Sequence, residues 1–209
     1  LSTETYMDLL MVGELILASS SQVRQEMLSK ANIPFVSIKP NIDEAEVKLS
    51  LLMESYSPRD IADALAELKA SKISSKHPNS LVLGCDQVLE FEGALLEKPS
   101  SKNLAVDQLL KLSGKRHTAF SAAVIFENCK PIWRFVGKTD IFFKNSSEKY
   151  IRDFVNRNWD SIKNSAGGYK IEEEGSRLST KISGDYFSIL GMPLLEIINF
   201  LGIKGMIDV

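Results

Sequence analysis

The sequence has little cysteine, little histidine and no long apolar segment. Its 209 residues include two cysteines, Cys85 and Cys129, and two histidines, His77 and His117. Two cysteines cannot build the disulfide framework of a small secreted domain, and neither histidine stands in a zinc-binding pattern. No run reaches the roughly 18 apolar residues that cross a bilayer. We therefore expect a cytoplasmic protein without a membrane partner.

Neither sign of charge dominates the sequence. Lys and Arg number 25 and Asp and Glu number 27, for a net charge of −2. This balance argues against a protein that binds nucleic acid through a basic face. With 44% hydrophobic and 25% charged residues, the composition is typical of a globular protein. We expect one domain over residues 14–209; residues 1–13, which include Met7 and Met11, are interpreted as an N-terminal extension.

The motifs of several common enzyme classes are missing. There is no G-x-S-x-G of a serine hydrolase, and neither the G-x-G-x-x-G of a dinucleotide fold nor a P-loop. Cys85 directly precedes Asp86, and a neighbouring carboxylate raises a thiol pKa. We therefore predict that Cys85 fills space at a strand end and is not a nucleophile.

Strand and helix patterns alternate along the chain, which predicts an α/β protein. Strands are predicted at residues 14–18, 34–38, 81–84, 117–126 and 131–143. Helices are predicted at residues 22–28, 57–73, 104–112, 146–155 and 193–201. Gly202 is expected to end the last helix, and Glu92-Gly93 predicts a hairpin turn.

Polar residues stand where the first predicted strand meets the first predicted helix. Ser19, Ser20 and Ser21 fill this junction, and the N–H groups of a helix N-terminus, together with serine hydroxyls, can hold a phosphate. Arg24 lies one turn into the helix and can reach the same anion. The alternative is an ordinary serine N-cap followed by a surface arginine, which is a common arrangement.

Carboxylates follow two other predicted strands. Asp86 comes after the strand that begins at residue 81, and Asp43 and Glu44 follow a break in the chain. Open α/β sheets bind ligands at the carboxyl ends of their strands, and carboxylates beside phosphates suit a divalent cation such as Mg²⁺. Lys69 and Lys98 could add positive charge. Taken singly, each of these residues is better explained as a solvated surface residue; their joint placement is what indicates a site.

Read together, these segments resemble the motifs of the Maf family, in the same order along the chain. Residues 15–28, LILASSSQVRQEML, are similar to L-I-L-A-S-x-S-P-R-R-x-E-L-L, and residues 84–88, GCDQV, to G-[AS]-D-[TQ]-V. The other similar segments lie at residues 42–44, 65–70, 93–99, 112–117, 166–169 and 181–194.

The resemblance implies a nucleoside triphosphate pyrophosphatase, a housekeeping hydrolase of the cytoplasm that uses Mg²⁺ or Mn²⁺. Such enzymes cleave between the α- and β-phosphates; the family name comes from an association with septum formation. The implied fold is a mixed sheet with long strands and two lobes flanking a deep nucleotide-binding cleft, and a homodimer is compatible with it. The alternative is a non-catalytic nucleotide-binding regulator of cell division.

The resemblance also implies roles for individual residues. Asp86 matches the proton acceptor and a metal ligand, and Asp43 matches an acidic position that binds metal. The residues that match the triphosphate clamp are Ser19, Arg24, Lys69 and Lys98.

Three positions depart from the family pattern or select among its branches. Val23 stands where the family has its first arginine, and valine cannot reproduce an arginine's forked donors; weaker activity or a different base is expected. Gln87 and Glu172 resemble the residues of the branch associated with 7-methyl-GTP. The chemistry agrees with this, since a carboxylate can accept hydrogen bonds from the ring N–H and the amine of guanine. Glu172 opens a run of three glutamates, and such a charge run is usually solvated surface.

Overall fold

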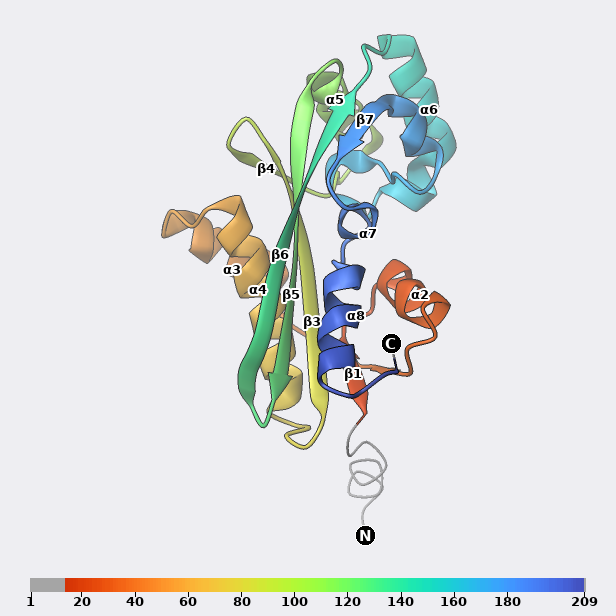
Figure 1. Cartoon of the computed structure of the whole chain (residues 1–209). Helices are drawn as coiled ribbons and strands as arrows, with labels where there is room; N and C mark the ends of the chain where they lie inside the picture. Colours follow the sequence, from red (N-terminus) through yellow and green to blue (C-terminus); the bar gives the residue numbers. More distant parts are fainter. Residues whose placement is uncertain (1–13, 209) are drawn as a thin grey trace. The chain divides into compact units, whose positions relative to one another are not determined.

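A computed structural model describes residues 14–208 of the chain (Figure 1). The strands are β1 (Leu15–Ala18), β2 (Val36–Ser37), β3 (Leu81–Phe91), β4 (Ala94–Leu96), β5 (Arg116–Glu127), β6 (Lys130–Phe143) and β7 (Ser179–Ser183). The helices are α2 (Gln22–Lys30), α3 (Glu44–Met53), α4 (Pro58–Ser74), α5 (Lys102–Leu112), α6 (Glu148–Ile162), α7 (Tyr186–Ile189) and α8 (Leu194–Ile203). Two short 3-10 helices are η1 (Ala166–Gly168) and η2 (Glu174–Leu178).

The strands form one mixed sheet in the order β2-β1-β3-β5-β6-β7, with β4 paired to β3. β1 is parallel to both β2 and β3, whereas the β3–β4 and β6–β7 pairs are antiparallel. The predicted α/β class and mixed sheet with long strands are therefore confirmed. The hairpin turn at Glu92-Gly93 is confirmed as well, with φ values of 53° and 84° that glycine tolerates best.

Some predicted boundaries differ from the structure. Gly202 does not end the last helix, because α8 continues to Ile203. The strand predicted at 34–38 is reduced to Val36–Ser37. Helix α3 was not predicted at all: none of its residues is buried, so it lacks the apolar stripe by which helices are recognised in a sequence.

The described chain divides into two compact units. Unit 1 comprises residues 14–87, 121–136 and 191–208, and unit 2 comprises residues 88–120 and 137–190. β3, β5 and β6 contribute residues to both units. The single domain over residues 14–209 and the cleft between two lobes stay predictions.

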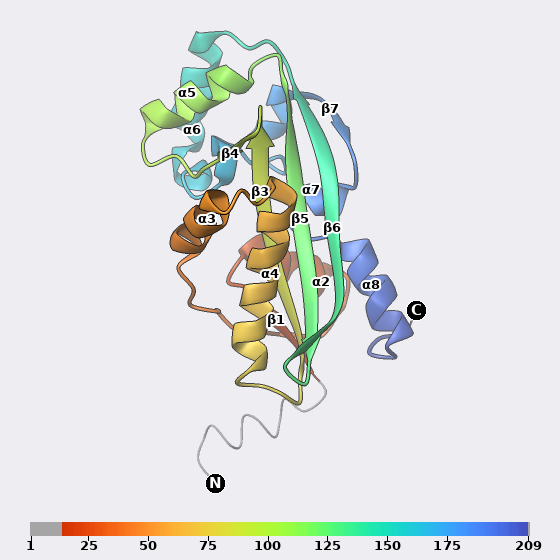
Figure 2. The same cartoon turned by 90° about the vertical axis from the view of Figure 1, so that its left-hand side faces the viewer.

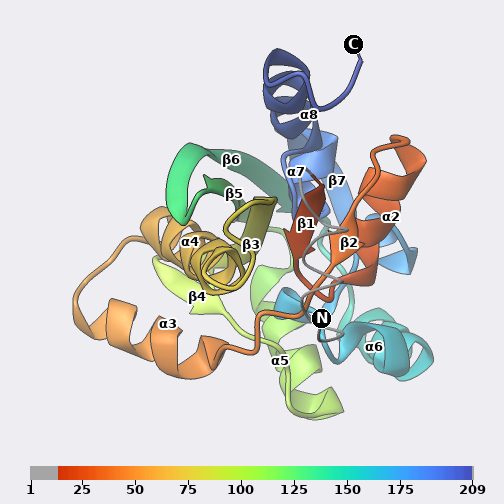
Figure 3. The same cartoon turned by 90° about the horizontal axis from the view of Figure 1, so that it is seen from below.

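In unit 1, α4 covers one face of the strands, and α2 and α8 lie on the opposite face (Figures 1 and 3). Helix α4 begins where the sequence predicts, because the Ser57 hydroxyl accepts from Asp60 N and Pro58 occupies the first turn. Its apolar stripe, including Ile61 and Leu65, is fully buried. Helix α3 precedes α4 on the same side of the sheet (Figure 2).

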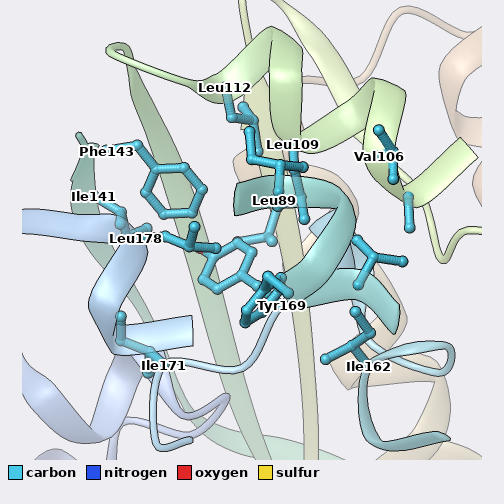
Figure 4. Close-up of a cluster of buried hydrophobic side chains, with 14 of the residues drawn as sticks. Leu89, Val106, Leu109, Leu112, Ile141, Phe143, Ile162, Tyr169, Ile171 and Leu178 are labelled. Atoms are coloured by element: carbon cyan, nitrogen blue, oxygen red, sulfur yellow. The ribbon is translucent and has the colours of Figure 1, made fainter. Parts of the chain in front are cut away.

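Unit 2 has its own hydrophobic core, built around α5 and α6. Figure 4 shows apolar side chains from β3, α5 and β6 converging on Tyr169. The buried members include Leu89, Val106, Leu109, Leu112, Ile141, Phe143, Ile151, Phe154, Ile162 and Leu178. No helix among residues 14–208 is long and apolar enough to cross a membrane.

His117 is a buried polar residue of this core. Only 1% of it is exposed, its Nε2 is 2.7 Å from the Tyr169 hydroxyl, and Phe143 packs edge-on against its ring at 4.7 Å. Burial lowers the pKa of His117 from 6.5 to about 4. The imidazole is therefore neutral at physiological pH and has a structural role.

The buried histidine makes the stability of the protein depend on pH. Between pH 6.5 and about 4 the unfolded chain holds a proton at His117 that the folded chain does not, so the free energy of unfolding falls as the pH falls, by about 3 kcal/mol in total. His117→Gln, which does not titrate, should lose this contribution. Denaturant unfolding from pH 7.5 to 4.5 measures it, and His77→Gln separates the contribution of the other histidine. If the free energy of unfolding depended on pH in the same way in wild type and His117→Gln, the assignment of this pH dependence to His117 would be contradicted.

Candidate functional site

The candidate site of unit 1 begins where β1 stops and β3 continues. Ala18, the last residue of β1, pairs with Gly84, so Asp86 and Gln87 lie beyond the last β1 pair. Successive strand residues face opposite sides of a sheet. Asp86 accordingly contacts α4 on one face, whereas Gln87 lies on the other face, near Arg24 of α2.

On the α4 face, a buried lysine joins two carboxylates. Lys69 Nζ lies 2.5 Å from Asp86 Oδ1 and 2.8 Å from Glu44 Oε1. Lys69 and Asp86 are each only 4% exposed. The second oxygen of Asp86, Oδ2, is buried without a hydrogen-bond partner among the described residues. Because buried carboxylate oxygens are nearly always paired, Oδ2 is suited to receive a water molecule or a cation.

Gly84 brings the lysine and the aspartate together. A Cβ at this position would overlap Ala66 O and lie 2.7 Å from Ala70 N of α4. Only a glycine therefore lets the backbone of α4 approach β3 this closely. The glycine of the G-C-D-Q-V segment thus has a packing function that places Lys69 beside Asp86.

On the opposite face, Arg24 is buried and has no carboxylate partner within residues 14–208. It is 9% exposed, and its donors reach neutral acceptors: Nε donates to Gly191 O at 2.9 Å and Nη1 to Cys85 O at 2.9 Å and Ser19 Oγ at 3.3 Å. Buried charges are normally paired. An anion beside the guanidinium would supply the missing charge.

The start of α2 adds further donors to the same place. Ser21 occupies the N-cap position, but its side chain makes no capping bond; its N–H donates instead to Ser19 Oγ at 3.2 Å. By contrast, α3 to α6 are capped by the side chains of Asp43, Ser57, Ser101 and Ser147. The alternative of an ordinary serine cap with a surface arginine is therefore wrong, and the first turn of α2 keeps N–H groups suited to a phosphate.

The structure distinguishes two neighbouring acidic residues that the sequence placed together. Asp43 Oδ1 accepts from Ala45 N and Glu46 N, which makes it the N-cap of α3. Glu44, the next residue, is the one that contacts Lys69. The sequence placed both residues among the carboxylates suited to a divalent cation, and the family resemblance singled out Asp43; no sign in the sequence showed that a helix starts between them.

Cys85 directly precedes Asp86 in β3 and is inert. It is fully buried, and burial raises the pKa of its thiol to about 11, against the opposing influence of Arg24 and Lys69. The prediction that Cys85 fills space is confirmed, but its place at a strand end is wrong, because β3 continues beyond the predicted residues 81–84 to Phe91.

Two predicted site residues belong to unit 2. Lys98 is exposed and precedes the buried Pro99. The backbone carbonyl of the preceding residue, Glu97, accepts a hydrogen bond from Gly167 N at 3.3 Å. The Lys98 loop therefore packs against the glycine turn that leads to Glu172. Lys98 and Glu172 therefore lie on neighbouring loops of this unit.

The three glutamates after this turn differ in their surroundings. Glu173 accepts from Ser161 and Lys170, and Glu174 accepts from Arg157 and Asn158; these hydrogen bonds lower the pKa of both carboxyls. Glu172 is exposed, and no hydrogen bond or ion pair to another described residue holds it. Of the run, only Glu172 keeps a carboxylate that a ligand could use.

Within the described part of the chain, no group of three or more His, Cys, Asp or Glu side chains is placed to hold a metal ion. Mg²⁺, however, is commonly bound through one or two carboxylates together with phosphate oxygens of a substrate. Asp86, with its unpartnered Oδ2, and the adjacent Glu44 fit that smaller requirement.

The sequence matches a family model described as Maf-like protein over residues 14–203. It is 54% identical over 198 residues to a nucleoside triphosphate pyrophosphatase of Ruegeria pomeroyi, covering 95% of this chain and 100% of the relative. Relatives of the same name in Roseobacter denitrificans and Caulobacter vibrioides are 53% and 42% identical, over 91% and 92% of this chain and 96% of each relative.

Proposed function

Because the chain belongs to the Maf-like protein family, we propose that it is a nucleoside triphosphate pyrophosphatase. It would hydrolyse the bond between the α- and β-phosphates and release a nucleoside monophosphate and pyrophosphate. The observation that carries the proposal is that two buried polar groups of unit 1 lack a partner among the described residues. Buried Arg24 lacks an anion among the described residues, and buried Asp86 keeps an unpartnered oxygen.

Asp86 is the residue we assign to the attacking water. Oδ2 orients the water and accepts its proton, while Lys69 holds Oδ1 and fixes the carboxylate. The water oxygen bonds to the α-phosphorus, the bond from that phosphorus to the bridging oxygen breaks, and pyrophosphate leaves with the electron pair. No covalent enzyme intermediate is required.

The positive groups stabilise the charge that develops on the phosphates. Arg24, Ser19 and the first turn of α2 provide donors held by a fixed backbone frame, and such preorganised donors lower the barrier for phosphoryl transfer. Lys98 is assigned to the same substrate. A divalent cation, Mg²⁺ or Mn²⁺, would be held by Asp86 and Glu44 and would neutralise phosphate charge. We assign Asp43 to placing Glu44, through its cap on α3.

For the base, we propose a preference for 7-methyl-GTP or another modified purine nucleotide. Glu172 has an available carboxylate, and a carboxylate accepts hydrogen bonds from both the ring N–H and the amine of guanine. Uracil and thymine offer one ring N–H, so they match such a group less well. Gln87 is the second residue we assign to base selection.

Glu172→Gln tests this preference. The amide loses the negative charge and replaces one acceptor oxygen with a donor, so kcat/KM for 7-methyl-GTP relative to UTP should fall about tenfold. Steady-state kinetics on 7-methyl-GTP, GTP, dTTP, UTP and CTP measure the ranking. Glu173→Gln is the matched control, because that carboxylate is engaged by Ser161 and Lys170. An unchanged ranking in Glu172→Gln would contradict base reading by this residue.

A further inference from the structure

We infer that Tyr169 is a positioning residue: through its hydrogen bond to His117 it fixes the turn that carries Glu172, and so places the carboxylate that we assign to the base. The inference rests on the proposed function, because it requires Glu172 to contact the nucleotide base. It concerns residues of unit 2 only, and no step of the proposed hydrolysis uses Tyr169 or His117.

Tyr169 is tied to the sheet by a buried hydrogen bond. Its hydroxyl lies 2.7 Å from Nε2 of His117 on β5, and the two residues are 6% and 1% exposed. Phe143 of β6 packs edge-on against the Tyr169 ring as well, with the ring centres 5.0 Å apart (Figure 4). Burial lowers the pKa of His117 to about 4 and raises the pKa of Tyr169. The bond therefore joins two neutral groups at physiological pH.

The backbone that leads to Tyr169 is a glycine turn. Gly167 and Gly168 have φ values of 79° and 70°, in the left-handed region that glycine adopts most readily, and glycine loses the most conformational freedom when it is ordered. Their N–H groups donate to Glu97 O at 3.3 Å and Ser165 O at 3.1 Å. The Tyr169 side chain reaches into the core, so its bond to the sheet fixes the end of this turn.

The chain turns back on itself directly after Tyr169, so the position of Tyr169 is passed on to Glu172. Glu173 N donates to Lys170 O at 3.3 Å, which makes Glu172 a central residue of a β-turn. A Cβ at Gly175 would lie 2.3 Å from the same Lys170 oxygen, so the following backbone packs closely on the turn. The charge of Glu172 contributes to the raised pKa of Tyr169, and the carboxylate therefore lies near enough to the hydroxyl to interact with it.

The far side of the turn is held by α6. Glu173 accepts from Ser161 Oγ at 2.6 Å, and Glu174 accepts from Arg157 Nη2 at 2.7 Å. Glu172 thus lies between two anchors, the buried bond of Tyr169 before it and the bonds to α6 after it. Loss of the first anchor leaves the turn held from one side, and the carboxylate then meets the base in more than one position.

The test is a double-mutant cycle between Tyr169 and Glu172. Tyr169→Phe removes the hydroxyl and keeps the ring; Glu172→Gln and the double variant complete the cycle. All are assayed as full-length protein for kcat/KM with 7-methyl-GTP and UTP, and amide hydrogen exchange of residues 166–174 is followed without nucleotide. Tyr150→Phe is the matched control, because the Tyr150 hydroxyl is buried in the same unit but has no hydrogen-bond partner among the described residues.

We expect Tyr169→Phe to lower the 7-methyl-GTP to UTP ratio about fivefold and to speed exchange in residues 166–174. Tyr150→Phe should change neither. In the double variant the ratio should equal that of Glu172→Gln, because a residue that acts only through Glu172 has no further effect on the ratio once that carboxylate is gone.

An unchanged ratio in Tyr169→Phe, with faster exchange or a lower melting temperature alone, would show a structural role only and overturn the inference. Effects that add in the double variant, or an equal change in Tyr150→Phe, would also overturn it. An unchanged ratio in Glu172→Gln would overturn base reading by Glu172, and the inference with it. The rise in melting temperature with each nucleotide measures the same preference without turnover. Absence of product from wild type would therefore overturn the proposed function, while nucleotide binding still decides the positioning role.

Discussion

Asp86→Asn should lower kcat for pyrophosphate release by about 1,000-fold. The amide cannot accept the proton of the attacking water, and it weakens the attraction for a cation. The fold should survive the change, because Lys69 keeps its second partner, Glu44, at 2.8 Å. The expected result is therefore a folded protein with very little activity.

Kinetics and ligand binding together test this expectation. Asp63→Asn is a matched control, since it removes a carboxylate from another ion pair of α4, with Arg134, and should leave kcat within about twofold, as expected for a pair outside the site. Stabilisation of Asp86→Asn by added nucleotide, measured by thermal unfolding, should persist, because the clamp is intact. If Asp86→Asn kept more than a tenth of the wild-type kcat, Asp86 would not be the proton acceptor.

Arg24→Lys should lower kcat/KM about 100-fold. A lysine has one nitrogen at the end of a flexible chain and cannot serve Gly191 O, Cys85 O and Ser19 Oγ while also facing a phosphate. The guanidinium is held in a fixed position by these three acceptors. The substitution preserves the positive charge, so it tests the geometry of the guanidinium donors and not the charge itself.

The control for this prediction is Arg59→Lys, an exposed arginine at the start of α4, which should leave the kinetics unchanged. Thermal unfolding with added pyrophosphate gives a second readout: the ligand should raise the melting temperature of wild type and raise that of Arg24→Lys much less. Equal kcat/KM in the two arginine variants would show that Arg24 supports the local structure only.

The sequence was sufficient to predict those parts of the site that follow from local rules. The end of β1 and the start of α2 were located by an apolar run that ends in polar residues. Asp86 and Gln87 were expected to follow a strand, whereas β3 continues through them to Phe91. The long strands β5 and β6 were predicted from two segments rich in β-branched and aromatic residues, at 117–126 and 131–143. Helix α4 was predicted from its cap and its apolar stripe.

The rest depended on contacts between residues distant in the sequence. No local pattern shows that Arg24 reaches Cys85 and Gly191, or that Gly84 is needed for the approach of Ala66. The absence of a side-chain capping bond at the start of α2 was not predictable either, since three consecutive serines are typical of a capped helix N-terminus. The different contacts of Asp43 and Glu44 were not predictable, because the helix that starts between them has no buried face.

The most direct test is product analysis of the purified wild-type protein with 7-methyl-GTP and Mg²⁺. Phosphorus NMR of the reaction should show 7-methyl-GMP and pyrophosphate in equal amounts. Release of orthophosphate with a nucleoside diphosphate would contradict cleavage between the α- and β-phosphates. Tight binding without any product, from this substrate and from GTP, dTTP, UTP and CTP, would contradict catalysis and favour the nucleotide-binding regulator.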